Sequence, residues 1–463
     1  MPINSFLYPG AKFIPAYEVA NSCRFNRADG PNMTKTPGSS GDLRKWTWSC
    51  WVKRGSISNG SQTMFNAGSS SNTQIRFDSD DTINFYQYNS GYTARLATNQ
   101  KFKDPTAWLH IVAHWDTDNG TAGDRMKLFV NGSEVTSFAT DTNPNQNLDS
   151  YFGASGTALY VGDKGDGAEE MDGYLAEVCF IDGQNLAPSS FGQFDSDSPN
   201  IWKPIDVSGL TFGTNGFYLD FEDSANLGND KNGGTDLTEN NIAATDQATD
   251  TPTNNFATLN PLDPSPNAIT FSEGNLKATG TSGDSARSTF GTFALSKGKW
   301  WCEIKVTVGT TYPLIGIIDS SSNRKVATYF ADSDSGTNQS GFGVLANDDI
   351  YHDGSVADTW VTFATDDIIG LGLDMDASPP TLTFKKNNGD EKTIDTEVPN
   401  SGFYNFPAIG LYYSAAIVEI NFGNPSYSIS SGNADANGYG NFEHAPKSGY
   451  YSCCTKNLAE FGG

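Results

Sequence analysis

The chain has 463 residues and a formal net charge of −25 at pH 7, and 12% of its residues are aromatic. That length is too great for one hydrophobic core, so two or three domains are expected. The negative charge argues against nucleic acid and anionic membrane surfaces as partners, because each phosphate contact would oppose the field of the protein. No segment reaches the apolar length of a membrane span, and Met1–Gly10 lacks the basic and apolar regions of a secretory signal.

The composition predicts an all-β protein. Turn-forming residues and aromatic residues are abundant, strong helix formers are scarce, and no window keeps a long 3.6-residue apolar period. The six cysteines have no framework spacing, and the adjacent pair Cys453 and Cys454 would form a strained disulfide. We therefore expect free thiols in a chain that folds in a reducing cytoplasm.

Residues 1–18 are expected to form an extended N-terminal arm with prolines at positions 2, 9 and 15, and residues 19–205 the first module. Within Lys45–Lys53, Trp46, Trp48 and Cys50 alternate with their neighbours and so share one face of a strand. Asn131-Gly132 is a strong type I′ hairpin signal. Further strands are predicted at 74–77, 82–86, 108–115, 126–130, 134–135, 159–162 and 173–182.

This first module resembles the laminin G-like, or concanavalin A-like, jelly roll. The resemblance rests on the tryptophan strand around Trp46, on Trp108–Ile111, on the hairpin Leu128–Gly132 and on Gly173–Val178. It implies a fold of two packed antiparallel sheets.

Residues 206–268 are expected to form a connector with one added strand, Gly216–Phe221. Residues 269–426 then form the second module, and residues 427–463 form a C-terminal tail. The second module resembles the SPRY domain, which is a β-sandwich that binds partners and is not an enzyme. The segments that carry this resemblance are 298–306, 341–344, 351–354, 367–376, 382–389, 406–411 and 421–423.

Nearly the whole chain is similar to structural proteins of marine tailed phages, with Asn21–Asn26 and Asp250–Asn260 typical of that group. The resemblance implies a virion component folded in the host bacterial cytoplasm: a tail fibre, a tail-associated protein or a capsid-surface fibre. Its expected partners are other virion proteins, further copies of itself as a homo-oligomer such as a trimer, and a host cell-surface glycan or protein. A structural cement protein without a host ligand and a lectin-like carbohydrate-binding protein are the alternatives.

The sequence offers little for catalysis, so we expect no enzymatic activity. Glucanases of the jelly-roll fold need two carboxylates about 5 Å apart on one strand face. Glu169 and Glu170 are adjacent and point to opposite faces, and Glu177 stands alone in its strand. His110 and His114 lie in a strand pattern that separates their side chains by about 13 Å, which is too far to share one metal ion.

A calcium ion is the one cofactor for which the sequence offers candidate ligands, although none is required. Asp116, Asp118 and Asp124 lie on a short loop after a predicted strand, and their hard carboxylate oxygens suit this ion. They do not complete the twelve-residue calcium loop, and aspartates also cap turns without any metal.

Aromatic rings are the other candidate binding groups, because a flat ring stacks on a sugar face. In the first module these are Tyr86, Tyr88 and Tyr92, and in the second Tyr312, Tyr329, Tyr351 and Trp360. Most rings of a sandwich fill its core instead. That role is expected for Trp46, Trp48, Trp300, Phe384 and Phe422.

Overall fold

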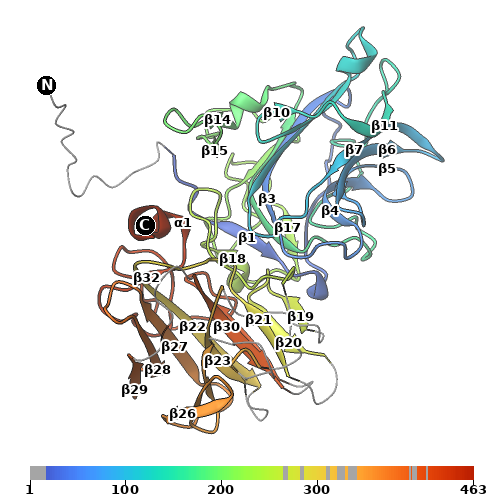
Figure 1. Cartoon of the computed structure of the whole chain (residues 1–463). Helices are drawn as coiled ribbons and strands as arrows, with labels where there is room; N and C mark the ends of the chain where they lie inside the picture. Colours follow the sequence, from blue (N-terminus) through green and yellow to red (C-terminus); the bar gives the residue numbers. More distant parts are fainter. Residues whose placement is uncertain are drawn as a thin grey trace, which may run out of the picture.

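The computed structural model describes residues 17–263, 269–281, 286–308, 313–320, 329–331, 341–395, 398, 404–412 and 416–462. Over these residues the chain forms two β-sandwiches in tandem, which confirms the predicted all-β fold class (Figure 1). The first sandwich is coloured blue to green in the figure and the second yellow to red. Among the helices of the described residues, none has the length and apolar character of a membrane span.

Two eight-stranded antiparallel sheets make up the first sandwich. One sheet has the order β10-β9-β8-β3-β13-β1-β18, with β16 paired to β13. Its strands are β1 (Ser22–Phe25), β3 (Lys45–Arg54), β8 (Leu109–Asp116), β9 (Met126–Val130), β10 (Ser133–Glu134), β13 (Gly173–Asp182), β16 (Phe217–Leu219) and β18 (Gln247–Ala248). The other sheet has the order β11-β7-β6-β5-β4-β12-β2-β17. Its strands are β2 (Asn32–Lys35), β4 (Gln62–Gly68), β5 (Asn72–Phe77), β6 (Thr82–Tyr88), β7 (Tyr92–Lys101), β11 (Phe138–Thr142), β12 (Leu159–Val161) and β17 (Thr238–Asn240).

The core between these sheets is rich in aromatic rings. Trp46 and Trp48 of β3 are fully buried, as the alternation predicts, and stack on Trp115 and Phe65 respectively. The opposite face of the β3 sheet is covered as well, because the segment that contains β14 (Gly192–Phe194) and β15 (Trp202–Pro204) folds over it. Both faces of β3 and β13 are therefore buried. The outer face of the second sheet reaches solvent at the tip of the β6–β7 hairpin, where Tyr92 is 46% exposed.

The connector is more tightly integrated than the sequence predicts. Where one added strand was expected, three short strands, β16, β17 and β18, join the sheets of the first sandwich. Strand β16 falls within the predicted Gly216–Phe221. The other two are only two or three residues long, too short for an alternating pattern to be visible.

In the second sandwich the described residues form an eight-stranded and a six-stranded sheet. The first contains β19 (Ile269–Ser272), β20 (Lys277–Gly280), β31 (Ile417–Asn421), β22 (Lys299–Val308), β27 (Ile368–Asp374), β28 (Thr381–Lys386) and β29 (Glu391–Ile394), and β32 (Tyr451–Ser452) pairs with β22 in parallel. The second contains β21 (Arg287–Phe290), β30 (Asn405–Leu411), β23 (Leu314–Asp319), β24 (Phe342–Leu345), β25 (Asp349–His352) and β26 (Ser355–Thr359). Trp300, Phe384 and Phe422 lie in its core, as predicted.

The tail packs back onto the rest of the molecule through β32 and α1 (Thr455–Phe461). The α1 helix lies where the two sandwiches meet (Figure 1). Around it the junction is polar and buried: Lys53 Nζ contacts Asp250 Oδ2 at 2.6 Å, Asn255 Oδ1 at 2.7 Å and the Phe256 carbonyl at 3.0 Å.

Direct contacts also join the two sandwiches. Arg24 forms an ion pair with Glu273 at 3.1 Å and donates to the Pro425 carbonyl at 3.1 Å. The Tyr174 hydroxyl donates to the Gly274 carbonyl at 3.2 Å. Since Arg24 and Tyr174 are buried, these bonds hold the two sandwiches against each other in one arrangement.

Candidate ligand-binding face of the first sandwich

Three tyrosines of the β6–β7 hairpin lie together on the outer face of the second sheet, and we call them the tyrosine cluster. The ring of Tyr92 meets the rings of Tyr86 and Tyr88 edge to face, with centroids 5.3 and 5.4 Å apart. Tyr88 pairs directly with Tyr92 across the hairpin, and Tyr86 is two residues along the same face. The structure therefore brings together the three first-module tyrosines that the sequence singles out.

Exposure differs sharply across the tyrosine cluster. Tyr92 is 46% exposed, Tyr88 is half-buried and Tyr86 is 5% exposed. Tyr86 is thus covered and has no free ring face for a ligand, whereas Tyr92 and Tyr88 do reach solvent. Burial raises the pKa of Tyr86, which keeps its hydroxyl protonated as a donor to Gln74.

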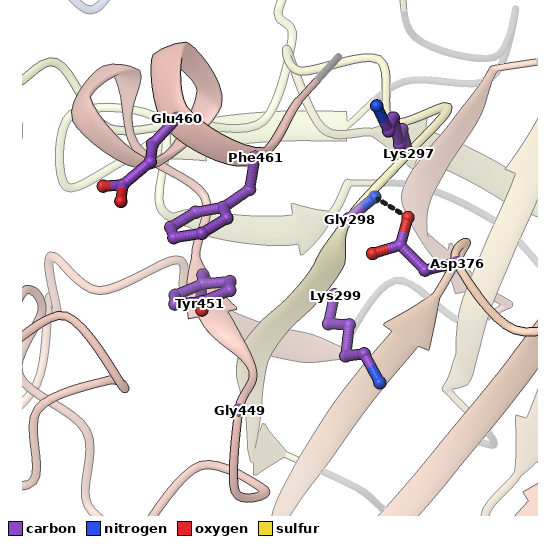
Figure 2. A pocket seen from close by; sticks show the side chains of 8 residues that line it. All are labelled: Lys297, Gly298, Lys299, Asp376, Gly449, Tyr451, Glu460 and Phe461. Atoms are coloured by element: carbon purple, nitrogen blue, oxygen red, sulfur yellow. Dashed lines mark hydrogen bonds between the residues drawn. The ribbon is translucent and has the colours of Figure 1, made fainter. Parts of the chain in front are cut away.

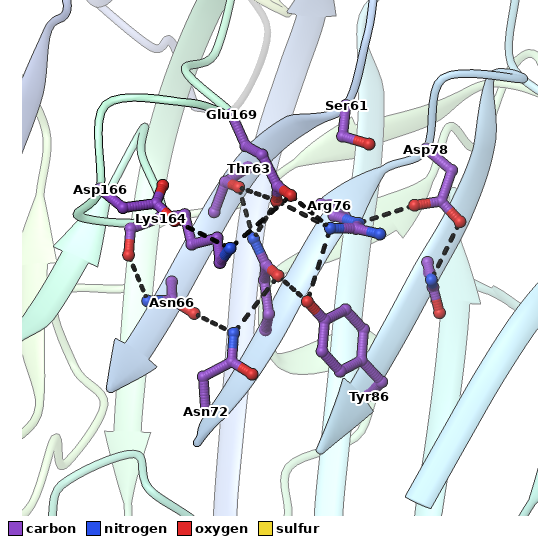
Figure 3. Close-up of polar contacts among 12 residues, drawn as sticks. Ser61, Thr63, Asn66, Asn72, Arg76, Asp78, Tyr86, Lys164, Asp166 and Glu169 are labelled. Carbon is purple, nitrogen blue, oxygen red and sulfur yellow. Dashed lines mark hydrogen bonds and ion pairs between the residues drawn. The ribbon is translucent and has the colours of Figure 1, made fainter. Parts of the chain in front are cut away.

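An ionic network centred on Arg76 supports the cluster (Figure 3). Arg76 Nη1 contacts both carboxylate oxygens of Glu169, at 2.8 and 2.7 Å, and its Nε contacts Asp78 Oδ1 at 2.7 Å. The guanidinium also lies over the Tyr86 ring, 5.2 Å from the centroid. Burial disfavours the charge of Arg76, but the facing Tyr86, Asp78 and Glu169 outweigh it and raise the pKa of the guanidinium.

The same network fastens the loop 163–170 to the sheet face. Gln74 Nε2 donates to Glu169 Oε2 at 2.9 Å, and the Thr63 amide donates to the Glu169 carbonyl at 2.7 Å. Asn66 Nδ2 donates to the Lys164 carbonyl at 2.8 Å. Each partner comes from β4 or β5, so the loop is held along two strands. These contacts of Glu169 could not be inferred from the sequence, because they span about 90 to 106 residues.

Beside the cluster lies a cavity of about 350 Å³, which we call the serine hollow. Its lining comprises residues 68–71, Tyr151, residues 156–158, Tyr160 and Gly165. The β4–β5 and β6–β7 turns adjoin at this end of the sheet, where Ser71 Oγ donates to Asn89 Oδ1 at 3.3 Å. The hollow thus offers two tyrosine rings and several hydroxyls next to Tyr88 and Tyr92. The run Gly68-Ser69-Ser70-Ser71 was its only visible signal in the sequence.

The second-module candidates are placed differently. Tyr312 lies outside the described residues. Tyr351 packs partly buried against the cluster that includes Leu314 and Phe330, and Tyr329 packs there beside Tyr412 at 6.0 Å. Trp360 packs against the core 6.0 Å from Phe384. The described residues do not bring these rings together into one open face.

The three candidate calcium ligands are not gathered at one point. Asp116 pairs with Lys45 at 3.7 Å, Asp118 with Arg44 at 3.9 Å, and Asp124 with Lys127 at 3.1 Å. Each carboxylate therefore faces a different cation. Within the described part of the chain, no group of three or more His, Cys, Asp or Glu side chains is arranged to hold a metal ion.

One buried pair has the composition of a nucleophile and its base. Ser49 Oγ lies 2.8 Å from His110 Nε2, and the Trp202 indole N–H donates to His110 Nδ1 at 2.9 Å. Because Nδ1 accepts that bond, the neutral ring carries its proton on Nε2 and donates it to Ser49. Burial lowers the pKa of His110 to about 3, which keeps the ring neutral. His110 therefore cannot accept the serine proton, and the arrangement is structural.

A second hollow, of about 300 Å³, lies between β22 and the C-terminal helix (Figure 2). Lys297, Lys299, Asp376 and Glu460 surround it, and Tyr451 stacks on Phe461 at 3.8 Å. Asp376 accepts a hydrogen bond from the Gly298 amide at 2.9 Å. Lys299 of β22 pairs with Asp374 of β27 at 2.9 Å, so its charge is already matched within the sheet. The stack of Phe461 on Tyr451 is the contact that joins α1 to this side of the hollow.

Comparison with known proteins assigns both sandwiches. Residues 29–184 match the laminin G family model of the concanavalin A-like lectin/glucanases superfamily, and residues 299–425 match the SPRY domain model. The chain carries a laminin G-like domain followed by a SPRY domain. The tyrosine cluster and the serine hollow therefore belong to the laminin G-like domain, whereas Tyr351 and Trp360 belong to the SPRY domain.

Solved structures are similar to one domain at a time. The SPRY domain of human HERC1 is 20% identical with a TM-score of 0.29, covering 35% of this chain and 96% of that chain. The native heptameric SAP-like pentraxin from Limulus polyphemus is 16% identical with a TM-score of 0.28, covering 37% of this chain and 80% of that chain. No curated protein sequence matches the chain at a significant level.

Proposed function

We propose that this chain is a non-enzymatic virion appendage protein of a tailed phage that recognises a host-surface glycan through its laminin G-like domain. It acts as a tail fibre, a tail-associated protein or a capsid-surface fibre, alongside other virion proteins and further copies of itself. The resemblance of the sequence to structural proteins of tailed phages supports the proposed place in a phage virion. The tyrosine cluster beside the serine hollow is the observation that carries the binding role.

Glycan binding suits this face for a chemical reason. A sugar presents an apolar ring face and a rim of hydroxyls, and it needs an aromatic platform next to hydrogen-bonding groups. Tyr92 and Tyr88 supply exposed ring area, and Ser69, Ser70 and Asn89 supply donors and acceptors at the adjoining turns. The Arg76 network holds Tyr86 and the hairpin in place, so little ordering is needed when a ligand binds.

Binding without catalysis also agrees with the arrangement of the polar groups. The carboxylate of Glu169 is neutralised by Arg76, and His110 holds its proton toward Ser49. Neither group is free to abstract or donate a proton to a ligand.

A structural role in the virion is the second candidate. The buried junction between the domains favours it, since a rigid two-domain unit is suited to bridging neighbouring proteins of a particle. In that case Tyr88 and Tyr92 would contact another virion protein and no host glycan.

Binding of the purified chain to candidate host cells and to a glycan array, with and without calcium, tests the proposal. We expect saturable binding that calcium does not alter, and a loss of about three- to tenfold in affinity for Tyr92→Ala and Tyr88→Ala. Tyr404→Ala is the matched control, because Tyr404 is 50% exposed but belongs to the SPRY domain. Absence of binding by a well-folded sample, or equal losses in all three variants, would favour the structural role.

A further inference from the structure

An apolar groove of about 430 Å³ lies where the two domains meet, apart from the glycan-binding face. Its walls come from the β14–β15 hairpin, the connector and the α1 helix, and its lining includes Tyr17, Ile201, Pro252, Thr253, Thr455 and Ala459. Ile201 is 57% exposed and so presents its aliphatic side chain to solvent at this groove. The groove therefore has the character of a seat for an apolar segment.

At the rim of the groove, two ion pairs cancel their own charges and one further carboxylate is left without a cation in the part of the chain that the structure describes. Lys203 pairs with Asp195 at 2.6 Å, and Lys456 pairs with Glu18 at 2.8 Å. Asp197 also lines the groove, and its carboxylate has no ion-pair partner among the described residues. A segment that fits this seat would be apolar and would carry a positive charge.

The N-terminal arm begins in the wall of this groove. Tyr17 donates a hydrogen bond from its hydroxyl to Glu177 Oε2 at 2.9 Å. Val19 exchanges backbone bonds with Thr253 Oγ1, at 3.1 Å through its amide and 3.3 Å through its carbonyl. These contacts fix the root of the arm beside Ile201 and Ala459, which line the same groove.

The sequence of the arm complements the groove. Residues 1–16 contain Phe6, Leu7, Phe13 and Ile14, include Lys12, and contain no Asp or Glu. Lys12 is therefore the only charged side chain of residues 1–16, in a chain of net charge −25. Pro9-Gly10 is a turn-forming pair about midway along the arm. Sixteen residues span at most about 55 Å when fully extended, which is ample for the arm to return to its own root.

We propose that the N-terminal arm of this chain docks in its own groove, with its apolar side chains over Ile201 and Ala459 and Lys12 near Asp197. The arm of the same chain is favoured over that of a second copy because its root is fixed at the groove. A short tether of this kind gives an effective concentration in the millimolar range.

The first test removes residues 2–15 and adds the arm back as a fluorescein-labelled peptide of residues 1–16. We expect the shortened chain to bind the peptide at least tenfold more tightly than the full chain, whose groove is already filled. Ile201→Asp in the shortened chain should abolish this binding, whereas Val356→Asp should not, because Val356 is 50% exposed on the distant β26. Equal binding to the shortened and full chains, or no effect of Ile201→Asp, would overturn the proposal.

The second test uses the full chain and so does not depend on the folding of a truncated one. All six native cysteines are buried, so an added pair, Phe6→Cys with Ala459→Cys, is the accessible one. Mild oxidation should give a disulfide within a monomer, and Phe6→Cys with Ser355→Cys should not. A disulfide-linked dimer would show instead that the arm reaches a neighbouring copy. Failure to form any disulfide would also overturn docking in the chain's own groove.

Discussion

At the scale of single residues, Glu303 in the SPRY domain is a buried carboxylate with no cation beside it among its contacts. Its oxygens accept the backbone amides of Glu443 at 2.9 Å and His444 at 2.7 Å, which fastens the tail to β22. Burial raises the pKa of Glu303 to about 7, and the two amide bonds only partly offset this effect. Ionisation of Glu303 therefore destabilises the folded chain.

We predict a pH-dependent difference in stability between Glu303→Gln and the native chain. The folded pKa lies above the unfolded value, so the native chain loses stability as pH rises from about 4.5 to about 7. The variant has no such titration. The free energy of unfolding of the variant, relative to that of the native chain, should therefore rise by up to about 3 kcal/mol over that interval. Urea unfolding at pH 5 and pH 8 measures this, with the exposed Glu134→Gln as the control. A difference that does not change with pH would contradict the prediction.

At the scale of elements, the loop 163–170 depends on Glu169 for its position on the sheet. Replacing Glu169 with Ala leaves the guanidinium of Arg76, whose side chain is 15% exposed, without its main partner. We expect a loss of about 1–3 kcal/mol in stability and faster amide exchange in the loop and at Thr63. Hydrogen exchange and urea unfolding measure both effects. Asp166→Ala in the same loop is the control, because its carboxylate is 48% exposed and its removal should cost about 0.5 kcal/mol or less.

Elements with strong local signals could be predicted from the sequence. The alternation in β3 and the hairpin at Asn131-Gly132 both appear as expected, with φ values of 47° and 76° at the two turn residues. Strand β7 was missed because its sequence, YTARLATNQK, is mostly polar and half of it lies at the surface. Its role becomes visible only when β6 and β11 pair with it on both sides.

The candidate site shows the same division. The tyrosine cluster could be anticipated because Tyr86, Tyr88 and Tyr92 surround one turn, so local geometry brings them together. The Arg76–Glu169 contact joins residues 93 positions apart, and no local pattern specifies it. The spacing of Asp116, Asp118 and Asp124 suggested a shared ion, but their actual partners lie at the start of β3, in the residue before it and in β9. Long-range pairing thus decides which polar residues cooperate.

At the scale of the whole molecule, the ion pair between Lys53 and Asp250 ties the laminin G-like domain to the connector. Its side chains are 1% and 0% exposed, and the ammonium has an acceptor for each of its three protons. Asp250 also accepts a bond from the Trp108 indole at 2.9 Å. Lys53 and Asp250 therefore fix the position of the connector around Phe256, just before the chain enters the second sandwich.

We expect Lys53→Met to destabilise the chain by about 3–5 kcal/mol, because it leaves the Asp250 carboxylate buried without a cation. It should also loosen the domain arrangement, which small-angle X-ray scattering would detect as a larger radius of gyration. Lys101→Met is the control: its pair with Asp80 is about half exposed and is expected to contribute less than about 1 kcal/mol. Unchanged stability of Lys53→Met would mean that other contacts hold the junction.

The contact between Glu18 and Lys456, at 2.8 Å, has a mechanical consequence. The first described residues and the last helix leave the body at the same place, beside the junction of the domains (Figure 1). A virion protein that holds either end therefore holds the molecule at one point, and the two domains extend away from that point. Tension between the first described residues and the β6–β7 hairpin would load the laminin G-like domain and bypass the SPRY domain, whereas tension applied through α1 would also load the SPRY core, against which Leu458 and Phe461 pack. Under tension applied through the first described residues, the SPRY domain would carry no load and would be free to make contacts of its own.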